Sequence, residues 1–72
     1  MYYVNIPEFK AEMVRKNYNI TSLSEKMGVC RATTARVLKG ENPTYHFICE
    51  SIKALDLSKE RALEIFFADK LT

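Results

Sequence analysis

The sequence predicts an all-α fold, a compact single domain of five helices within residues 1–72. Apolar residues recur three and four positions apart along most of the chain, as they do on one face of a helix. Capping residues, glycines and prolines separate these periodic segments, where helices begin and end. A chain of 72 residues is also long enough for only one small core. The segments predict helices over residues 7–17, 20–27, 31–39, 45–55 and 59–69.

The first predicted helix begins at Pro7, whose missing N–H would have no partner in a first turn. Glu8 and Glu12 would complement the positive N-terminal end of the helix dipole, and Arg15 would complement the negative C-terminal end. We expect the buried stripe of this helix to consist of Phe9, Met13 and Val14.

Two short helical patterns meet at Gly28 in the middle of the chain. Asn19 is a suitable N-cap for the first, and Ser22 with Glu25 offers an alternative start. Gly28 can adopt the left-handed conformation that ends a helix. The second helix starts after Cys30, which is a poor N-cap. Two helices this short and this close together predict a helix-turn-helix. The i, i+3, i+4, i+7 spacing of the first is carried by Ile20, Leu23, Ser24 and Met27.

The second of these helices, residues 31–39, has two contrasting faces. The inner face holds Thr34, Val37 and Leu38. The outer face has no acid and consists of Ala32, Arg36 and Lys39, flanked by Arg31 and Thr33. Such a surface can approach base edges closely while its cations reach guanine or phosphate. A solvated, mildly basic helix face is the alternative interpretation.

The run SLSEKMGVCRATTARVLKGENPT, residues 22–44, resembles the helix-turn-helix of the phage repressor and Cro type. That signature has a Lys-apolar-Gly turn followed by a Ser-Arg-x-Thr opening to the recognition helix. The chain is also similar to short phage Cro-like regulators, which finish with a Phe-Phe pair and a basic residue, here Phe66, Phe67 and Lys70. Two positions depart from the pattern: Cys30 replaces the usual Ser, and Thr34 replaces the usual Val or Ile.

This resemblance implies a five-helix, lambda-repressor-like domain that binds double-stranded operator DNA as a transcriptional repressor of phage or prophage type. The helix from Arg31 would lie in the major groove. Guanidinium groups pair well with guanine, and small side chains contact the thymine methyl, so we expect base contacts from Arg31, Ala32, Thr33 and Arg36. We expect phosphate contacts from Asn19, Ser22 and Lys39, and by resemblance alone from Asn42 and Thr44.

Charge is distributed unevenly along the chain. Residues 1–40 contain seven Lys or Arg against three Asp or Glu, a net +4, whereas residues 41–72 contain four against six, a net −2. A basic half that holds the helix-turn-helix is consistent with one face turned toward a polyanion. The aromatic segment Tyr2-Tyr3-Val4 precedes it, as a short strand or an arm. Because this segment lacks basic residues, we expect it to pack on the body rather than contact DNA.

The last two predicted helices start after good N-caps, Thr44 and Ser58. In the first of them we expect burial of Tyr45, Ile48, Ile52 and Leu55. In the second, Leu63, Phe66 and Phe67 would form one apolar face, with Ile65 and Ala68 around the cylinder from it. Repressors of this type generally bind two-fold operators as pairs, so we expect a homodimer with an interface that includes Ile65, Phe67 and Ala68.

Other classes of function have less support. Cys30, Cys49 and His46 cannot supply four zinc ligands, and no acid, base and nucleophile cluster, so we expect no metal, cofactor, small-molecule substrate or enzymatic activity. The chain has no apolar run of about 18 residues and no leader pattern, which predicts a cytoplasmic protein without membrane contact. The alternative function is a protein-interaction module, antirepressor or antitoxin-like, that binds its partner through Ile65, Phe67 and the last helix.

Overall fold

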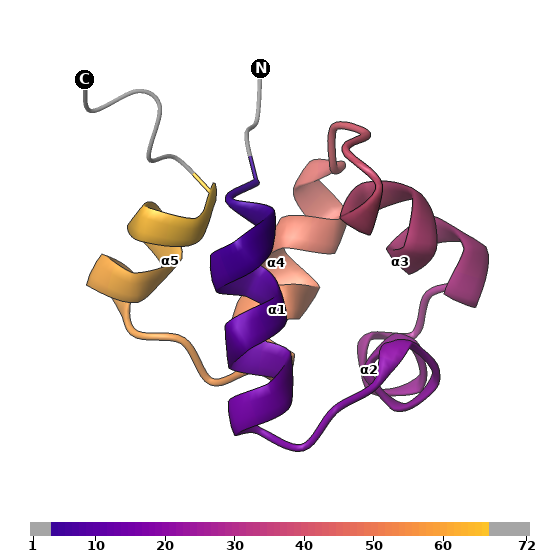
Figure 1. The fold of residues 1–72 in the computed structure, drawn as a ribbon, viewed down its shortest axis with the longest axis horizontal. Coiled ribbons are helices and arrows are strands. Elements are labelled where there is room, and N and C mark those ends of the chain that lie inside the picture. The colour runs from indigo at the N-terminus through magenta and orange to yellow at the C-terminus, as the bar shows by residue number, and fades with distance from the viewer. Residues whose placement is uncertain (1–3, 67–72) are drawn as a thin grey trace.

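The computed structural model describes residues 4–66, and within that range it contains five α-helices and no strand (Figure 1). This confirms the predicted all-α class. The helices are α1 (Ile6–Arg15), α2 (Ile20–Met27), α3 (Arg31–Leu38), α4 (Tyr45–Ala54) and α5 (Lys59–Phe66). The radius of gyration is 11.0 Å, close to the ~11 Å expected of a compact chain of this length.

Left-handed residues explain why α1 and α4 stop earlier than predicted. The φ angles of Asn17 and Asp56 are 63° and 52°, a conformation that cannot continue a right-handed helix. After α1, the Tyr18 N–H turns back to the Met13 carbonyl at 2.8 Å. α1 also begins one residue before the prediction, because Asn5 is its N-cap and accepts from the Glu8 N–H at 3.4 Å. The predicted end of the last helix, residue 69, lies outside the described residues.

The core is built around Phe9 of α1. Its ring stacks on Phe47 with centroids 6.1 Å apart and meets Phe66 edge-on at 6.0 Å. Aromatic pairs in these two arrangements add to the stabilisation that comes from burial. All five helices or their ends contribute to the buried apolar cluster, which consists of Phe9, Met13, Leu23, Met27, Val37, Phe47, Ile48, Leu55, Ile65 and Phe66.

Two residues of α1 and α4 that were predicted to be buried are exposed. Val14 is 75% exposed and Tyr45 is 66% exposed. At 3.6 residues per turn, Val14 lies about 140° around α1 from Phe9, so it faces away from the stripe that Phe9 and Met13 form. Tyr45 lies about 100° from the centre of the buried face of α4, which consists of Phe47, Ile48, Ser51 and the C-cap residue Leu55.

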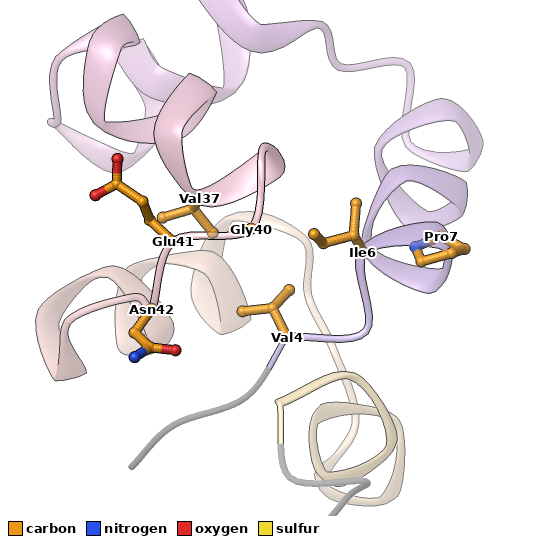
Figure 2. A pocket seen from close by; sticks show the side chains of 7 residues that line it. All are labelled: Val4, Ile6, Pro7, Val37, Gly40, Glu41 and Asn42. Atoms are coloured by element: carbon orange, nitrogen blue, oxygen red, sulfur yellow. The ribbon is translucent and has the colours of Figure 1, made fainter.

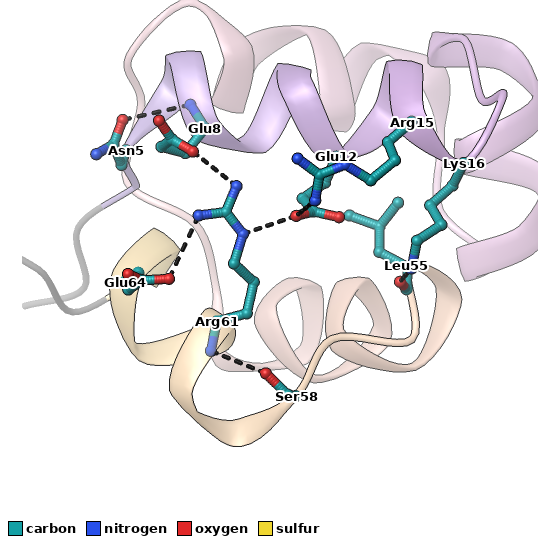
Figure 3. A network of polar contacts seen from close by, with 9 residues as sticks. All are labelled: Asn5, Glu8, Glu12, Arg15, Lys16, Leu55, Ser58, Arg61 and Glu64. Carbon is teal, nitrogen blue, oxygen red and sulfur yellow. Dashed lines mark hydrogen bonds and ion pairs between the residues drawn. The ribbon is translucent and has the colours of Figure 1, made fainter.

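A polar network joins α5 to α1 through Arg61 (Figure 3). Arg61 Nε donates to Glu12 Oε2 at 2.7 Å, and Arg61 Nη2 donates to Glu8 Oε1 at 2.6 Å. Arg15 approaches the same Glu12 oxygen at 2.7 Å, and Glu64 lies 3.4 Å from Arg61. Glu12 lies beyond the first turn of α1, where Glu8 is the acid, so it does not complement the helix dipole as predicted. Its side chain is only 3% exposed and accepts from two guanidinium groups, those of Arg15 and Arg61.

Ionisation of Glu12 is favoured by this arrangement. The hydrogen bond from Arg61 lowers the pKa of Glu12 below its ordinary value, with further lowering by the charge of Arg15, while burial acts in the opposite direction. The same hydrogen bond raises the pKa of Arg61. Both groups are therefore charged at neutral pH, and each is the main partner of the other.

The α2–α3 pair and α5 lie on opposite sides of α1 and α4 (Figure 1). α2 packs on both α3 and α4, and α5 packs on α1. The longest helices in the described range have 10 residues, and none has the length and apolar character required to cross a bilayer. This arrangement leaves the outer surface of α3 at one end of the molecule, away from the α1–α5 network.

Candidate nucleic-acid interface

α2 begins at Ile20 because Asn19 closes a capping box. The Asn19 Oδ1 accepts from the Ser22 N–H at 2.8 Å, and the Ser22 Oγ accepts from the Asn19 N–H at 3.0 Å. These reciprocal bonds satisfy two otherwise unpaired donors at the helix start. The predicted N-cap is confirmed, and the alternative start at Ser22 with Glu25 is not used. Asn19 and Ser22, two of the residues predicted to contact phosphate, therefore already hydrogen-bond to the backbone at the start of α2.

The turn between α2 and α3 is set by Gly28. Its φ of 73° is left-handed, a conformation that glycine adopts without strain, and the Val29 N–H donates to the Ser24 carbonyl at 3.0 Å. Cys30 is then the N-cap of α3, and it makes no side-chain capping bond, as expected of cysteine. Cys30 is exposed and its thiol is free. The two helices are thus joined by three residues, and the start of α3 is the weaker of the two helix starts.

A buried hydroxyl pair fixes α3 against α2. The Ser24 and Thr34 oxygens lie 2.6 Å apart, with the two residues 1% and 0% exposed. A hydroxyl buried without a partner would destabilise the fold, but here each residue satisfies the other. Thr34, one of the two departures from the repressor signature, is therefore accommodated by Ser24 on the facing helix. The pair holds α3 so that the opposite side of the helix faces outward.

The outer face of α3 carries the predicted base-contacting residues. Arg31, Ala32 and Arg36 are exposed, Thr33 is partly buried, and α3 contains no acid. Lys39, the C-cap of α3, is also exposed and continues the basic surface. The structure thus brings these side chains together on one accessible helix, with cations near both ends and small residues between them.

An open hollow of about 440 Å³ lies beside this face, between α3 and the start of α2. Ala32 and Ala35 leave room there because neither side chain extends beyond Cβ. The sequence interpretation did not select Ile20, Thr21 or Ala35 for this surface, although two alanines three positions apart on a helix indicate such a space. The hollow is lined by Ile20, Thr21, Arg31, Ala32 and Ala35.

The loop after α3 holds the remaining predicted phosphate contacts. Asn42 is exposed. Thr44 is the N-cap of α4, where its hydroxyl accepts from the Phe47 N–H at 3.1 Å. Thr44 is therefore engaged in capping, as Asn19 and Ser22 are, whereas Lys39 and Asn42 present their side chains to solvent.

A second pocket joins this loop to the N-terminal segment (Figure 2). It measures about 290 Å³, and Val4 and Ile6 line it opposite Gly40 and Asn42. Val4 also packs against the hydrophobic core. The described end of the predicted N-terminal arm therefore packs on the body, as expected, whereas Tyr2 and Tyr3 lie outside the described residues.

One charged residue at this surface was missed. Glu41, in the loop after α3, places Oε2 3.8 Å from Arg36 Nε, and the two side chains are 61% and 57% exposed. Its position could have been predicted from the sequence, because Glu41 directly follows Gly40, the glycine after the C-cap of α3. The outer face of α3 is therefore bordered by a carboxylate.

The predicted dimer interface on α5 requires correction. Ile65 is 0% exposed and belongs to the core. The buried face of α5 is formed by Ala62, Ile65 and Phe66. It is rotated by about one residue from the predicted apolar face, which included Leu63, and Leu63 is 38% exposed. Ile65 is therefore unavailable to a second subunit or another protein. Phe67 and Ala68, the other predicted interface residues, lie outside the described residues.

Among residues 4–66, no three His, Cys, Asp or Glu side chains are grouped so that they could hold a metal ion. Comparison with known proteins gives no match to any protein-family model, to any curated protein or to any solved structure.

Proposed function

We propose that this protein binds double-stranded DNA sequence-specifically and represses transcription, as a regulator of phage or prophage type. In this proposal α2 and α3 are a helix-turn-helix, and α3 enters the major groove of an operator. Repression follows because the bound protein occludes a promoter. The homodimer remains a prediction of the resemblance to phage repressors.

The observation that carries the proposal is the acid-free outer face of α3, where Arg31, Ala32 and Arg36 are exposed. The major groove of B-DNA is about 12 Å wide and admits an α-helix. Small residues allow the helix to approach base edges, and each arginine can form two parallel hydrogen bonds with guanine O6 and N7. The hollow beside Ala32 and Ala35 suits an apolar group such as the methyl of thymine.

The rest of the structure supports this role by making the face rigid. The buried bond between Ser24 and Thr34 fixes the rotation of α3, and Val37 anchors the same helix in the core. Rigid elements place recognition side chains more precisely than loops do. Lys39 and Asn42, both exposed near the C-terminal end of α3, supply phosphate contacts that fix the register.

The test starts from a random-sequence duplex library, from which the wild-type protein enriches its preferred duplex. Fluorescence anisotropy then compares Arg36→Ala with Lys59→Ala, which removes the same charge from the exposed start of α5. We expect Arg36→Ala to weaken binding to the enriched duplex by roughly 5- to 150-fold, the value of one bidentate guanine contact. Lys59→Ala is expected to have a much smaller effect. Failure to enrich any duplex, or equal losses in the two variants, would refute the proposal.

A further inference from the structure

The negative charge of Glu41 lies next to the C-terminal end of α3, where a negative charge is unfavourable. The last turn of a helix carries a partial negative charge, so a carboxylate there is unfavourable. Between Glu25 and Glu41 the sequence contains no acid, while it contains four Lys or Arg. Glu41 is therefore the acid that directly borders the outer face of α3. The cation within reach of it is Arg36, at 3.8 Å.

The backbone at the end of α3 holds Glu41 in this place. The Gly40 N–H donates to the Val37 carbonyl at 3.0 Å, and the Glu41 N–H donates to the Arg36 carbonyl at 3.1 Å. This pair of bonds is the Schellman closure, which requires a left-handed residue, and Gly40 supplies it with a φ of 112°. Figure 2 shows the Glu41 carboxylate directed away from Val4 and Ile6, the opposite side of the pocket. The backbone of Glu41 is thus held against the last turn of α3, the turn that also carries Arg36.

The atoms of the ion pair matter for recognition. Glu41 approaches Nε of Arg36, on the side of the guanidinium nearest the helix. The two terminal amino groups are not used by this contact, and a terminal fork of this kind can donate to guanine O6 and N7. A carboxylate at Nε also reduces the gain from moving the guanidinium onto a phosphate, because the phosphate and the carboxylate repel each other.

We propose that Glu41 is a positioning and specificity-determining residue for DNA. It holds Arg36 toward a guanine base and weakens attachment of the same arginine to the sugar-phosphate backbone. This inference rests on the proposed DNA-binding function. It assigns to the loop after α3 a role in choosing between bases and phosphates, beyond general attraction to DNA.

The experiment measures a ratio of affinities by fluorescence anisotropy. The wild type, Glu41→Gln and Glu60→Gln are each titrated with the duplex that the wild type enriches and with the unselected library. Glu60→Gln is the matched control, since it removes one negative charge from an exposed position on α5. We expect Glu41→Gln to bind the unselected library more tightly and the enriched duplex no more tightly, which lowers the specificity ratio by about two- to fivefold, as for an exposed ion pair. Glu60→Gln is expected to leave the ratio unchanged.

A second comparison tests whether Glu41 acts through Arg36. In an Arg36→Ala background, Glu41→Gln should no longer change the ratio, because the partner of the carboxylate is gone. Circular dichroism confirms that each variant retains its helices. An unchanged ratio in Glu41→Gln, or an equal change with and without Arg36, would overturn the inference while leaving DNA binding intact. The absence of any enriched duplex would instead refute the proposed function, and the inference with it.

Discussion

Thr34 is one of the residues that hold α3 against the rest of the fold. Its hydroxyl is buried and lies 2.6 Å from that of Ser24, across the interface between α2 and α3. The resemblance to phage repressors implies an apolar residue at position 34, and the structure explains why a polar one is tolerated. Two hydroxyls that satisfy each other act as a unit, so the loss of one leaves the other buried without a partner.

A double-mutant cycle tests this pairing. Thr34→Val and Ser24→Ala should each lower the free energy of unfolding by about 1 to 2 kcal/mol, because each leaves an unsatisfied hydroxyl in the core. The double variant should lose less than the sum of the two, since no unpaired group remains. Urea unfolding followed by circular dichroism measures all four proteins. Strict additivity would show that the two hydroxyls are not coupled.

At the scale of the element, the ends of α3 differ in how well they are closed. The C-terminal end has its Schellman bonds at Gly40, whereas the N-terminal end has Cys30, whose side chain makes no capping bond. The backbone of Cys30 has φ −72° and ψ 146°, which is the extended conformation that serine adopts as an N-cap. The backbone of Cys30 therefore has the conformation of an N-cap, but its side chain lacks an oxygen that could accept a hydrogen bond.

Cys30→Ser should therefore stabilise the protein, by about 0.5 to 1 kcal/mol, because the serine hydroxyl can accept a new hydrogen bond from a backbone N–H in the first turn of α3. Cys49→Ser, at a partly buried position inside α4, is the control and should bring no such gain. Thermal unfolding measures both. A stability of Cys30→Ser equal to or below that of the wild type would contradict this account of the helix start.

The sequence predicted the elements far better than it predicted their faces. The bounds of α2 were predicted correctly because its signals, Asn19 and Gly28, are local. The burial of Val14, Tyr45 and Ile65 was predicted wrongly because one residue corresponds to about 100° around a helix, and spacings of three and four fit two neighbouring stripes. Only the packing of the helices on one another selects between such stripes.

Some features of the candidate site could likewise be predicted from local sequence, and others could not. The basic, acid-free face of α3 follows from the local order of residues in one helix. Its border at Glu41 depends on how the chain turns after Gly40, and its hollow depends on how α2 lies beside α3. These features require the tertiary arrangement, which a periodic pattern within one helix does not contain.

At the scale of the whole molecule, α5 is attached to α1 by contacts over 49 and 53 residues of sequence, from Arg61 to Glu12 and Glu8. No local pattern could indicate such a pair. α5 and α3 lie on opposite sides of α1 (Figure 1). The role of the Arg61 network is therefore to hold the fold together rather than to contact the partner that we propose for α3.

Stability should depend on pH through Glu12. Because the folded state lowers the pKa of Glu12 below its ordinary value of 4.5, its contribution is complete above that value and is lost as the pH falls through the folded pKa. Glu12→Gln should reduce the free energy of unfolding at neutral pH by about 1 to 3 kcal/mol and make its fall in acid shallower. Urea unfolding across the acid range measures this effect.

Glu64→Gln is the matched control for that experiment. Glu64 contacts the same arginine at 3.4 Å, but its side chain is 64% exposed, so its loss should change stability by less than about 1 kcal/mol. Equal losses in the two variants would show that burial of Glu12 does not strengthen its bond with Arg61.

Recognition of DNA by α3 can be tested by locating the DNA on the surface of the protein. Isotope-labelled protein is titrated with its enriched duplex, and the backbone amide chemical shifts are followed by nuclear magnetic resonance. We expect the largest shifts in α3 from Arg31 to Arg36 and at the start of α2, and only small shifts in α5. Shifts concentrated on α5 or on the exposed side of α1 around Val14, or no shifts at all, would contradict recognition of DNA by α3.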